Sequence, residues 1–315
     1  MKYRELQAYL RLQCAKSCEW LAALRYLNGD ARLELRIDRS HSARGFISEL
    51  VTDKGSISCT GSEAGFRLTG YNGPYFVIGL VHEGAIELIG RLDDDPMDSG
   101  VFVLSPGEKI DLVVSAGFQS TVLRFPKKVF SRREILTSEV LNGIRDTVLG
   151  YLQRSLFFYD HAHAIAETRR LQSCVVGWLK GQHSNTFAQS MVLDRRIGRA
   201  IVKMQSEVDW TFDLAELARC AGVSERNLYY LMNSHIGMTP YRFHQRCRLS
   251  RVRERLVDCQ GEQVNISRFA SDEGFTHTGR FAALYREHFG ELPKETVQLR
   301  RAVLADESEV SAASA

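Results

Sequence analysis

The sequence predicts an α+β protein with two domains, a strand-rich one followed by an all-α one. Three observations indicate this class. A chain of 315 residues has the length of two domains. Short runs with strand character, separated by glycine-rich turns, fill residues 31–130. Near the carboxyl end a helical pattern occurs twice, between residues 213 and 293, as expected of two helix-turn-helix units.

The composition limits the class of protein and its compartment. Hydrophobic residues make up 44% of the chain and charged residues 25%, which is typical of a globular protein in water. The net charge is +3, and residues 191–301 carry 18 Lys and Arg against 14 Asp and Glu, an excess that suits DNA binding. Seven cysteines, no signal peptide and no membrane-length apolar run predict a cytoplasmic protein without membrane partners.

The first 28 residues have apolar side chains at helical spacing, which predicts one or two amphipathic helices. Those side chains are Leu6, Leu10, Cys14, Leu21, Leu24 and Leu27. Such a helix would pack on the next domain or, alternatively, contact a second subunit. The strand runs that follow are LELRI, GSISC, FRLTG, YFVIGLVHEG, AIELIGRL, VFVLSP, DLVVSA and STVLRFP. Strands this short and this numerous predict a small barrel or jelly roll over about 31–130.

Helical spacing returns over about 134–182, with one apolar stripe from Val140 to Leu156 and another from Leu171 to Leu179. These stripes either pack on the barrel or form a dimer interface, and their width favours the dimer. Residues 1–182 would then be one domain for effector binding and dimerisation. The polar residues 183–191 are predicted to link it to a DNA-binding domain at 192–301, and residues 302–315 to be a disordered tail.

The two helical units match at seven positions. Ala218, Gly222 and Ser224 recur 52 residues later as Ala270, Gly274 and Thr276, and Leu231, His235, Gly237 and Pro240 recur 53 residues later as Leu284, His288, Gly290 and Pro293. Asp213 is expected to cap the first helix of its unit, with Glu216 completing a capping box. Gly222 would take the turn, and Ser224 would cap the second helix.

Between the units, residues 241–256 place apolar side chains among six arginines. This pattern predicts a long helix that joins the units. Such a helix would hold the two recognition helices about one DNA turn apart, roughly 34 Å.

These features resemble the DNA-binding domain of the AraC/XylS family of bacterial transcription regulators. The resemblance is carried by the L-A-x-x-x-G-V-S-x-R-x-L run from Leu217, the two G-x-x-P closings, the basic joining helix and the F-x-x-x-Y-x-x-x-F-G run from Phe281. It implies a ligand-responsive, sequence-specific regulator that inserts two recognition helices into successive major grooves. An activator, a homodimer and RNA polymerase as a partner are expected, as is a cupin-like sensor barrel, for which G-V-F-V-L-S-P-G-E is the best local match.

The resemblance also implies which residues contact DNA. In the first unit the base-reading positions fall on Arg226, Tyr229 and Tyr230, with Ser224, Asn227 and Asn233 beside them. In the second unit they fall on Thr278, Gly279 and Ala283, flanked by Thr276, His277 and Arg280. Family members often carry arginine at the position of Ala283, and neither Gly279 nor Ala283 offers a bidentate donor to guanine. The first unit is therefore predicted to carry most of the base readout.

An effector site is predicted at the start of the barrel, where Arg32, Arg36, His41 and Arg44 cluster, with Tyr71 and Tyr75 further along. Arginines can hold a carboxylate or phosphate bidentately. The Arg32-x-x-x-Arg36 spacing, followed by Ser40-x-Ser42-x-x-Gly45, is loosely similar to the arginine motif of PilZ-type cyclic di-GMP binders. Cyclic di-GMP is thus one candidate effector, and salt-bridged surface arginines are the alternative interpretation. The sequence does not otherwise identify the effector.

Neither a metal site nor an enzyme is predicted. The strand region offers only His41 and His82 to a cupin metal, and His161 and His163 stand among helical residues. One alternative function is a DNA-repair methyl-acceptor enzyme, which can carry the same helical domain. It would need an activated cysteine, but Cys220, Cys247 and Cys259 occupy core-like helical positions and no P-C-H-R run exists. A second alternative is an architectural DNA binder, which would have no effector pocket.

Overall fold

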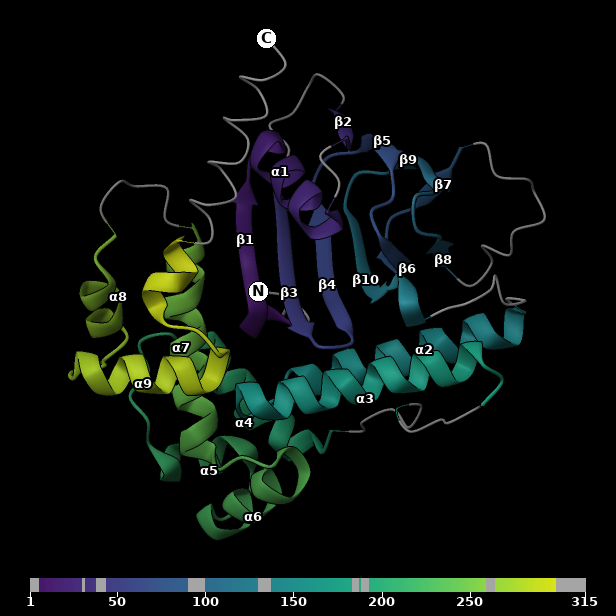
Figure 1. Cartoon of the computed structure of the whole chain (residues 1–315). Helices are drawn as coiled ribbons and strands as arrows, with labels where there is room; N and C mark the ends of the chain where they lie inside the picture. Colours follow the sequence, from purple (N-terminus) through teal and green to yellow (C-terminus); the bar gives the residue numbers. More distant parts are fainter. Residues whose placement is uncertain are drawn as a thin grey trace.

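The structure is a computed structural model that describes residues 6–29, 32–37, 44–89, 100–129, 137–182, 187, 193–258 and 264–298. A strand-rich amino-terminal part is followed by a carboxyl-terminal part made of helices (Figure 1). The predicted order of a mixed domain and an all-α domain is therefore confirmed. Within the described ranges, no helix combines the length and apolar character needed to cross a bilayer.

In the described part of the chain, ten strands form two antiparallel sheets. The larger sheet has the order β1-β3-β4-β10-β6-β8, with β1 at Leu10–Ala15, β3 at Gly45–Thr52, β4 at Gly55–Ser62, β10 at Phe118–Pro126, β6 at Tyr75–Glu83 and β8 at Val101–Leu104. The smaller sheet has the order β2-β5-β9-β7, with β2 at Glu34–Ile37, β5 at Phe66–Tyr71, β9 at Lys109–Val114 and β7 at Ile86–Leu88. Because the strands that the structure describes form two separate ladders, the expected cupin-like barrel is not confirmed.

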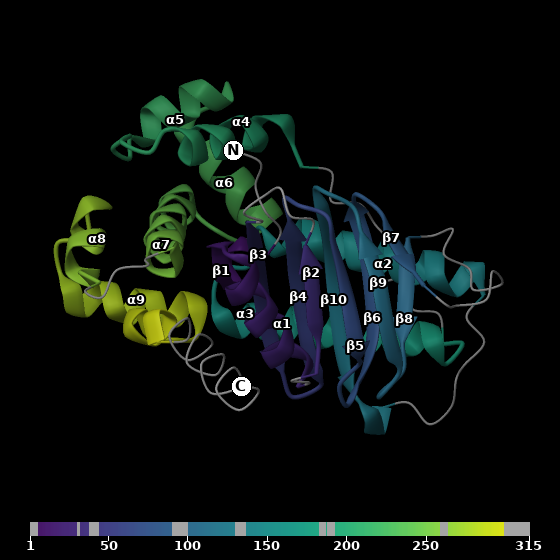
Figure 2. The same cartoon turned by 90° about the horizontal axis from the view of Figure 1, so that it is seen from above.

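The larger sheet is covered on both faces, and strand alternation decides which side chains face which layer. Ile57 and Leu123 pack with the helices α2 (Ser138–Ser155) and α3 (His161–Leu179), which lie along one face (Figures 1 and 2). Val122 points to the other face, where it joins the core shared by the two sheets and the helix α1 (Ser17–Asn28).

The apolar stripes of α2 and α3 are buried within the chain. Leu141, Ile144, Val148, Leu171 and Val175 are at most 2% exposed and belong to the cluster that backs the larger sheet. Packing on the sheets, one of the two interpretations of these stripes, therefore accounts for their width. The homodimer stays a prediction, without support from these side chains.

The first 28 residues are only partly helical, so the predicted helix spacing was wrong for residues 10–15. A 3-10 turn at Gln7–Tyr9 leads into β1, which pairs with β3. The sequence patterns did not predict β1. Leu10 and Leu12 are both buried by strand alternation, whereas Cys14, with φ of 50°, interrupts the register before Ala15. The predicted helix begins only at Ser17.

Phe187 is the single described residue of the predicted linker, and it is anchored. Its side chain is fully buried against Tyr151, with Arg154 and Arg170 over its ring. Gly150 leaves room for it, since a Cβ on Gly150 would lie 2.0 Å from the Phe187 carbonyl oxygen. The rest of the predicted linker and the predicted tail at 302–315 lie outside the described residues.

The carboxyl-terminal helices divide between two hydrophobic cores. They are α4 (Arg195–Ser206), α5 (Leu214–Ala221), α6 (Glu225–Ile236), α7 (Pro240–Asp258), α8 (Ile266–Asp272) and α9 (Thr278–Phe289). One core joins α4, α5 and α6 to the start of α7. The other continues from Tyr9 and Leu10 through the second half of α7 into α8 and α9. The α8–α9 pair thus shares a core with the amino-terminal part, and the predicted joining helix is α7.

Candidate functional site

The α5–α6 pair has the local geometry that its sequence predicts. Asp213 caps α5 by accepting hydrogen bonds from the amides of Ala215 and Glu216, at 2.8 and 3.0 Å. Gly222 ends α5 in the left-handed region at φ of 73°, and Ser224 caps α6. The predicted capping box is wrong, because the Glu216 carboxylate instead accepts from Lys203 and from the Trp210 indole.

The α8–α9 pair repeats this geometry with one change. Asn265 caps α8, and Gly274 has φ of 72°, close to the value at Gly222. The extra residue after Thr276 shifts the start of the last helix, so His277 is the N-cap of α9 and makes no side-chain cap bond. Thr276 therefore does not reproduce the capping role of Ser224.

Both second helices turn their predicted DNA-contacting side toward solvent. On α6, Tyr229 and Tyr230 are 50% and 68% exposed. Ser224, Arg226 and Asn233 are also exposed and Asn227 is half-buried. On α9 and the turn before it, the exposed residues are Thr276, His277, Thr278, Gly279, Arg280 and Ala283. The structure thus brings each predicted set together on one outward surface.

The opposite sides of the same helices are buried. Leu228, Leu231 and Met232 hold α6 in its own core, and Phe281, Tyr285 and Phe289 hold α9 in the shared core. This amphipathic division fixes which face of each helix can meet a ligand as large as a duplex.

Most arginines of α7 make ion pairs or hydrogen bonds within the protein. Arg251 pairs with Glu273 at 2.7 Å, and Arg255 pairs with Asp272 at the same distance. Arg246 is buried and donates to the Leu156 carbonyl oxygen. These contacts tie α7 to α8 and to the loop after α2, so the basic pattern of this helix reflects internal packing more than a DNA-facing surface.

A buried charge cluster connects the two parts of the chain. Arg253, 1% exposed, donates from Nε to the Leu10 carbonyl oxygen at 3.1 Å and pairs with Glu291 at 2.9 Å. Arg11 of β1 pairs with the same carboxylate. Burial by itself would raise the pKa of Glu291, but the charges of Arg253 and Arg11 and hydrogen bonds from Thr296 and Arg11 outweigh it and lower the pKa to about 2.

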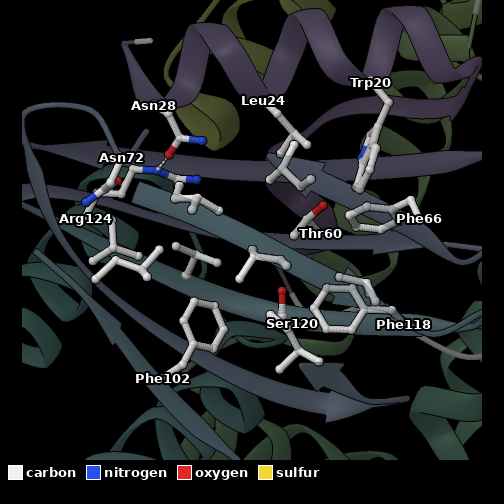
Figure 3. Close-up of a pocket in the computed structure, with 18 residues that line it drawn as sticks. Trp20, Leu24, Asn28, Thr60, Phe66, Asn72, Phe102, Phe118, Ser120 and Arg124 are labelled. Carbon is white, nitrogen blue, oxygen red and sulfur yellow. Dashed lines mark hydrogen bonds between the residues drawn. The ribbon is translucent and has the colours of Figure 1, made fainter. Parts of the chain in front are cut away.

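An apolar cavity of about 80 Å³ lies between the two sheets, with α1 along one side (Figure 3). Residues from α1 and from strands of both sheets line it, among them Leu24, Phe66, Phe102 and Phe118. The sequence suggested a ligand site in this part of the chain, but not these residues.

One buried cation stands in the wall of this cavity. Arg124 of β10 is 4% exposed, and its guanidinium donates to the Asn28 side chain at 3.1 Å and to the Ser58 hydroxyl at 2.7 Å. The position of this arginine between Leu123 and Phe125 in the strand run STVLRFP was a signal that the sequence contained, because unpaired arginine is rarely fully buried.

The predicted effector cluster lies elsewhere. Arg32 stacks over the Tyr71 ring at 4.7 Å, and Arg36 pairs with Glu34 at 3.9 Å with both side chains exposed. Arg44 is exposed and Tyr75 half-buried, while His41 lies outside the described residues. None of these five described side chains lines the cavity. Their binding of an effector, cyclic di-GMP included, stays a prediction.

Groups that could support metal or cysteine chemistry are scattered. Within the described ranges, no three His, Cys, Asp or Glu side chains gather as metal ligands. His161 and His163 begin α3, as the sequence predicted, and His82 shares a 2.7 Å hydrogen bond with Thr121. Cys247 is buried, but Cys220 is exposed, which corrects its predicted core position, and Cys259 lies outside the described residues.

Sequence comparisons with known proteins find a helix-turn-helix family and transcription regulators among the relatives of this chain. A family described as a helix-turn-helix domain matches residues 217–299. The XylDLEGF operon transcriptional activator 3 of Pseudomonas putida is 29% identical over 227 residues, which cover 66% of this chain and 68% of that protein. The XylDLEGF operon transcriptional activator 2 of the same organism is 35% identical over 116 residues, covering 37% of this chain and 74% of that protein. A solved structure of an AraC-type transcriptional regulator from Chromobacterium violaceum is 26% identical with a TM-score of 0.31, and covers 34% of this chain and 92% of that one.

The matched region contains α6, α7, α8, α9 and most of α5, and hence both outward surfaces. The relatives are described as transcriptional activators, and such proteins act by binding DNA rather than as enzymes. The chain belongs to the AraC/XylS family of DNA-binding transcription regulators.

Proposed function

We propose that this chain is a ligand-responsive transcriptional activator with two helix-turn-helix units, α5–α6 and α8–α9. The observation that carries the proposal is the repeated geometry: each pair has a capped first helix, a left-handed glycine in the turn, and a second helix with an exposed polar face. Helices of this kind enter the major groove. With α7 as a spacer, α6 and α9 would occupy successive grooves.

The two helices would contribute unequally to sequence readout. Exposed Arg226 and Asn233, with half-buried Asn227, give α6 the donors and acceptors that read base edges. On α9, Gly279 has no side chain and open space where a Cβ would lie, and the side chain of Ala283 has no polar atom. Arg280, beside them, is then the side chain that can donate hydrogen bonds. We therefore assign most base readout to α6, and phosphate contacts and groove shape to α9.

The sensing part of the proposal rests on the cavity between the sheets. A small molecule that binds there with different affinity in two conformations would change their populations, and with them the presentation of α6 and α9. Residues 1–182 would form the sensing domain and residues 192–301 the DNA-binding domain. A homodimer and RNA polymerase are the further partners that we expect. The methyl-acceptor and purely architectural alternatives have no such observation in their favour.

A binding experiment tests the DNA part directly. The full chain would be used to select its site from random duplex DNA, and the affinity for single-base variants of that site would then be measured for Arg226→Ala and Arg280→Ala. Arg226→Ala is expected to cost about 1–3 kcal/mol and to relax preference at one position. Arg280→Ala should weaken all sites alike and make affinity less steeply dependent on salt.

Arg268→Ala is the matched control, because Arg268 is an exposed arginine on α8 outside both surfaces. It should leave base preference unchanged. If Arg280→Ala relaxes preference more than Arg226→Ala, the division of labour is reversed. Failure of the full chain to enrich any site would refute the regulator itself.

A further inference from the structure

One turn of the amino-terminal part contacts both helix-turn-helix pairs. Residues 156–161, which join α2 to α3, are called here the α2–α3 turn. Figure 1 shows the joined ends of α2 and α3 beside α9, and α3 contacts α9. The α5–α6 and α8–α9 pairs belong to separate cores, and α7 enters both of them. The α2–α3 turn is therefore a second connection between the two pairs, in addition to α7.

Phe157 and Tyr159 connect the turn to the first pair. The Phe157 ring packs on the core of α4–α6, and its centroid lies 6.5 Å from that of Phe243. Tyr159 lies against Gly237, the residue at which α6 ends. A Cβ built on Gly237 would be 3.9 Å from the Tyr159 ring, which is an ordinary van der Waals distance. The C-terminal end of α6 thus rests on the α2–α3 turn.

The second pair meets the same turn at the equivalent position of the repeat. His161 lies against Gly290, which ends α9 as Gly237 ends α6. This contact is closer, because a Cβ built on Gly290 would lie 2.5 Å from the His161 ring. His288 Nδ1 also donates to the Tyr159 carbonyl oxygen at 3.2 Å, since a carbonyl oxygen can only accept. Burial lowers the pKa of His288 to about 3, so this imidazole is neutral near pH 7.

The α2–α3 turn is itself anchored to the helices that it joins. Phe158 is 2% exposed, and its ring centroid lies 5.5 Å from that of Tyr151 on α2 and 5.4 Å from that of His163 on α3. Asp160 caps α3 by accepting a hydrogen bond from the His163 amide at 2.8 Å. The Tyr159 ring stacks on the His163 ring at 4.1 Å. The side chains that contact the two pairs are therefore held on a fixed segment.

Contacts at the C-terminal end of a recognition helix control the position of its other end. The helices α6 and α9 have 12 residues each and are therefore about 18 Å long. Such helices contact bases from their N-terminal residues. Tilting one by about 10° about its C-terminal end moves its first turn by about 3 Å, close to the rise of about 3.4 Å between successive base pairs. A small change at the α2–α3 turn would thus shift one helix by about one base pair relative to the other.

We propose that the α2–α3 turn clamps the C-terminal ends of α6 and α9 and thereby fixes the spacing between the two DNA half-sites. Tyr159 and His161 are then positioning residues, which contact no base but determine where α6 and α9 contact theirs. The helix α7 connects the pairs along a single axis, whereas a second connection away from that axis also resists rotation about it. The inference rests on the proposed function, in which both helices enter DNA.

The spacing that the full chain accepts tests the clamp. A site would be selected from random duplex DNA, and affinity would be measured for that site, for the site with one base pair inserted between its half-sites, and for one half-site alone. For the wild type the insertion should weaken binding about tenfold, as one mismatched base pair does.

The double variant Tyr159→Ala/His161→Ala removes both side chains of the clamp. Tyr159 is exposed and His161 half-buried, so the fold should tolerate their loss. The insertion should then weaken binding only about threefold or less. Affinity for the single half-site should equal that of the wild type, because one helix suffices for it.

Gly290→Ala and Gly237→Ala are a matched pair of single variants. The two glycines have φ of 80° and 67°, so alanine brings similar backbone strain to the end of each helix. The new Cβ collides with the His161 ring in Gly290→Ala, whereas in Gly237→Ala it stays at contact distance from Tyr159. Gly290→Ala should therefore reduce the cost of the insertion, and Gly237→Ala should keep it at about tenfold.

The clamp is refuted if the double variant keeps the wild-type cost of the insertion. It is also refuted if the double variant loses as much affinity for the single half-site as for the complete site, since that result indicates general damage to the fold. The double variant decides the matter should Gly290→Ala fail to fold. A wild-type chain that selects only one half-site would instead refute the insertion of two helices on which the proposed function depends, and the clamp with it.

Discussion

Glu291→Gln removes the carboxylate on which the contact between the two parts of the chain is centred. This carboxylate pairs with Arg253 at 2.9 Å and with Arg11, and accepts from Thr296 at 2.6 Å. The amide would leave Arg253 buried and uncompensated, 1% exposed beside the Leu10 carbonyl oxygen. Removing one partner of a buried ion pair destabilises a protein by about 3–5 kcal/mol.

The lowered pKa of Glu291 reflects the same contacts and indicates a similar magnitude. Its decrease from 4.5 to about 2 is equivalent to about 3 kcal/mol of folding free energy near pH 7. Because the folded pKa is below the unfolded one, this stabilisation is complete above about pH 5 and is lost as the pH falls toward 2. The variant has no group to titrate, so its deficit should shrink from about 3 kcal/mol near pH 7 to about 1 kcal/mol near pH 3.

Urea unfolding of both proteins over this pH range measures the deficit. Glu287→Gln is the matched control: Glu287 lies on α9 and also pairs with an α7 arginine, Arg242, but both side chains are about half exposed. Exposed pairs contribute about 1 kcal/mol or less. If Glu291→Gln costs no more than Glu287→Gln, or if its deficit does not change with pH, the carboxylate does not hold the two parts together.

Two further substitutions test local geometry. Asp213→Ala should cost about 1 kcal/mol, since it removes the cap of two α5 amides, and a urea midpoint unchanged within error would contradict that role. Gly79→Ala would place its Cβ 2.0 Å from the Phe102 ring, so we expect a loss of about 1–3 kcal/mol in the free energy of unfolding as the ring is displaced. A urea midpoint equal to that of the wild type would show that the ring has space elsewhere.

The helical half could be predicted from the sequence because its signals are local. Asp213, Gly222 and Ser224 act within one or two turns of their own helices, so reading the sequence in order found them. The missed bond partners of Glu216 show the limit, since Lys203 belongs to another helix. Exposure of Arg226 and Tyr230 followed from spacing alone.

The strand-rich half was harder to predict from the sequence, because its organisation depends on contacts between residues far apart in the chain. Leucines at 6 and 10 fit a helix as well as a turn and a strand, and only pairing with β3 decides between them. The cavity is lined by Trp20, Thr60 and Arg124, which lie too far apart in the sequence for a local pattern to group them. The arginines that looked suited to a ligand, Arg32 and Arg36, instead have partners at the surface.

The division of the helices between two cores determines how the molecule opens. Phe243 and Cys247 of α7 belong to the core of α4–α6, whereas Leu249, Val252 and Leu256 belong to the core that reaches β1. Elements that share a core tend to unfold as one cooperative unit. Amides of α9 should therefore exchange with solvent at the slow rate of the sheet, while those of α6 exchange through a separate, easier opening. An occupied cavity would slow the first group and leave the second almost untouched.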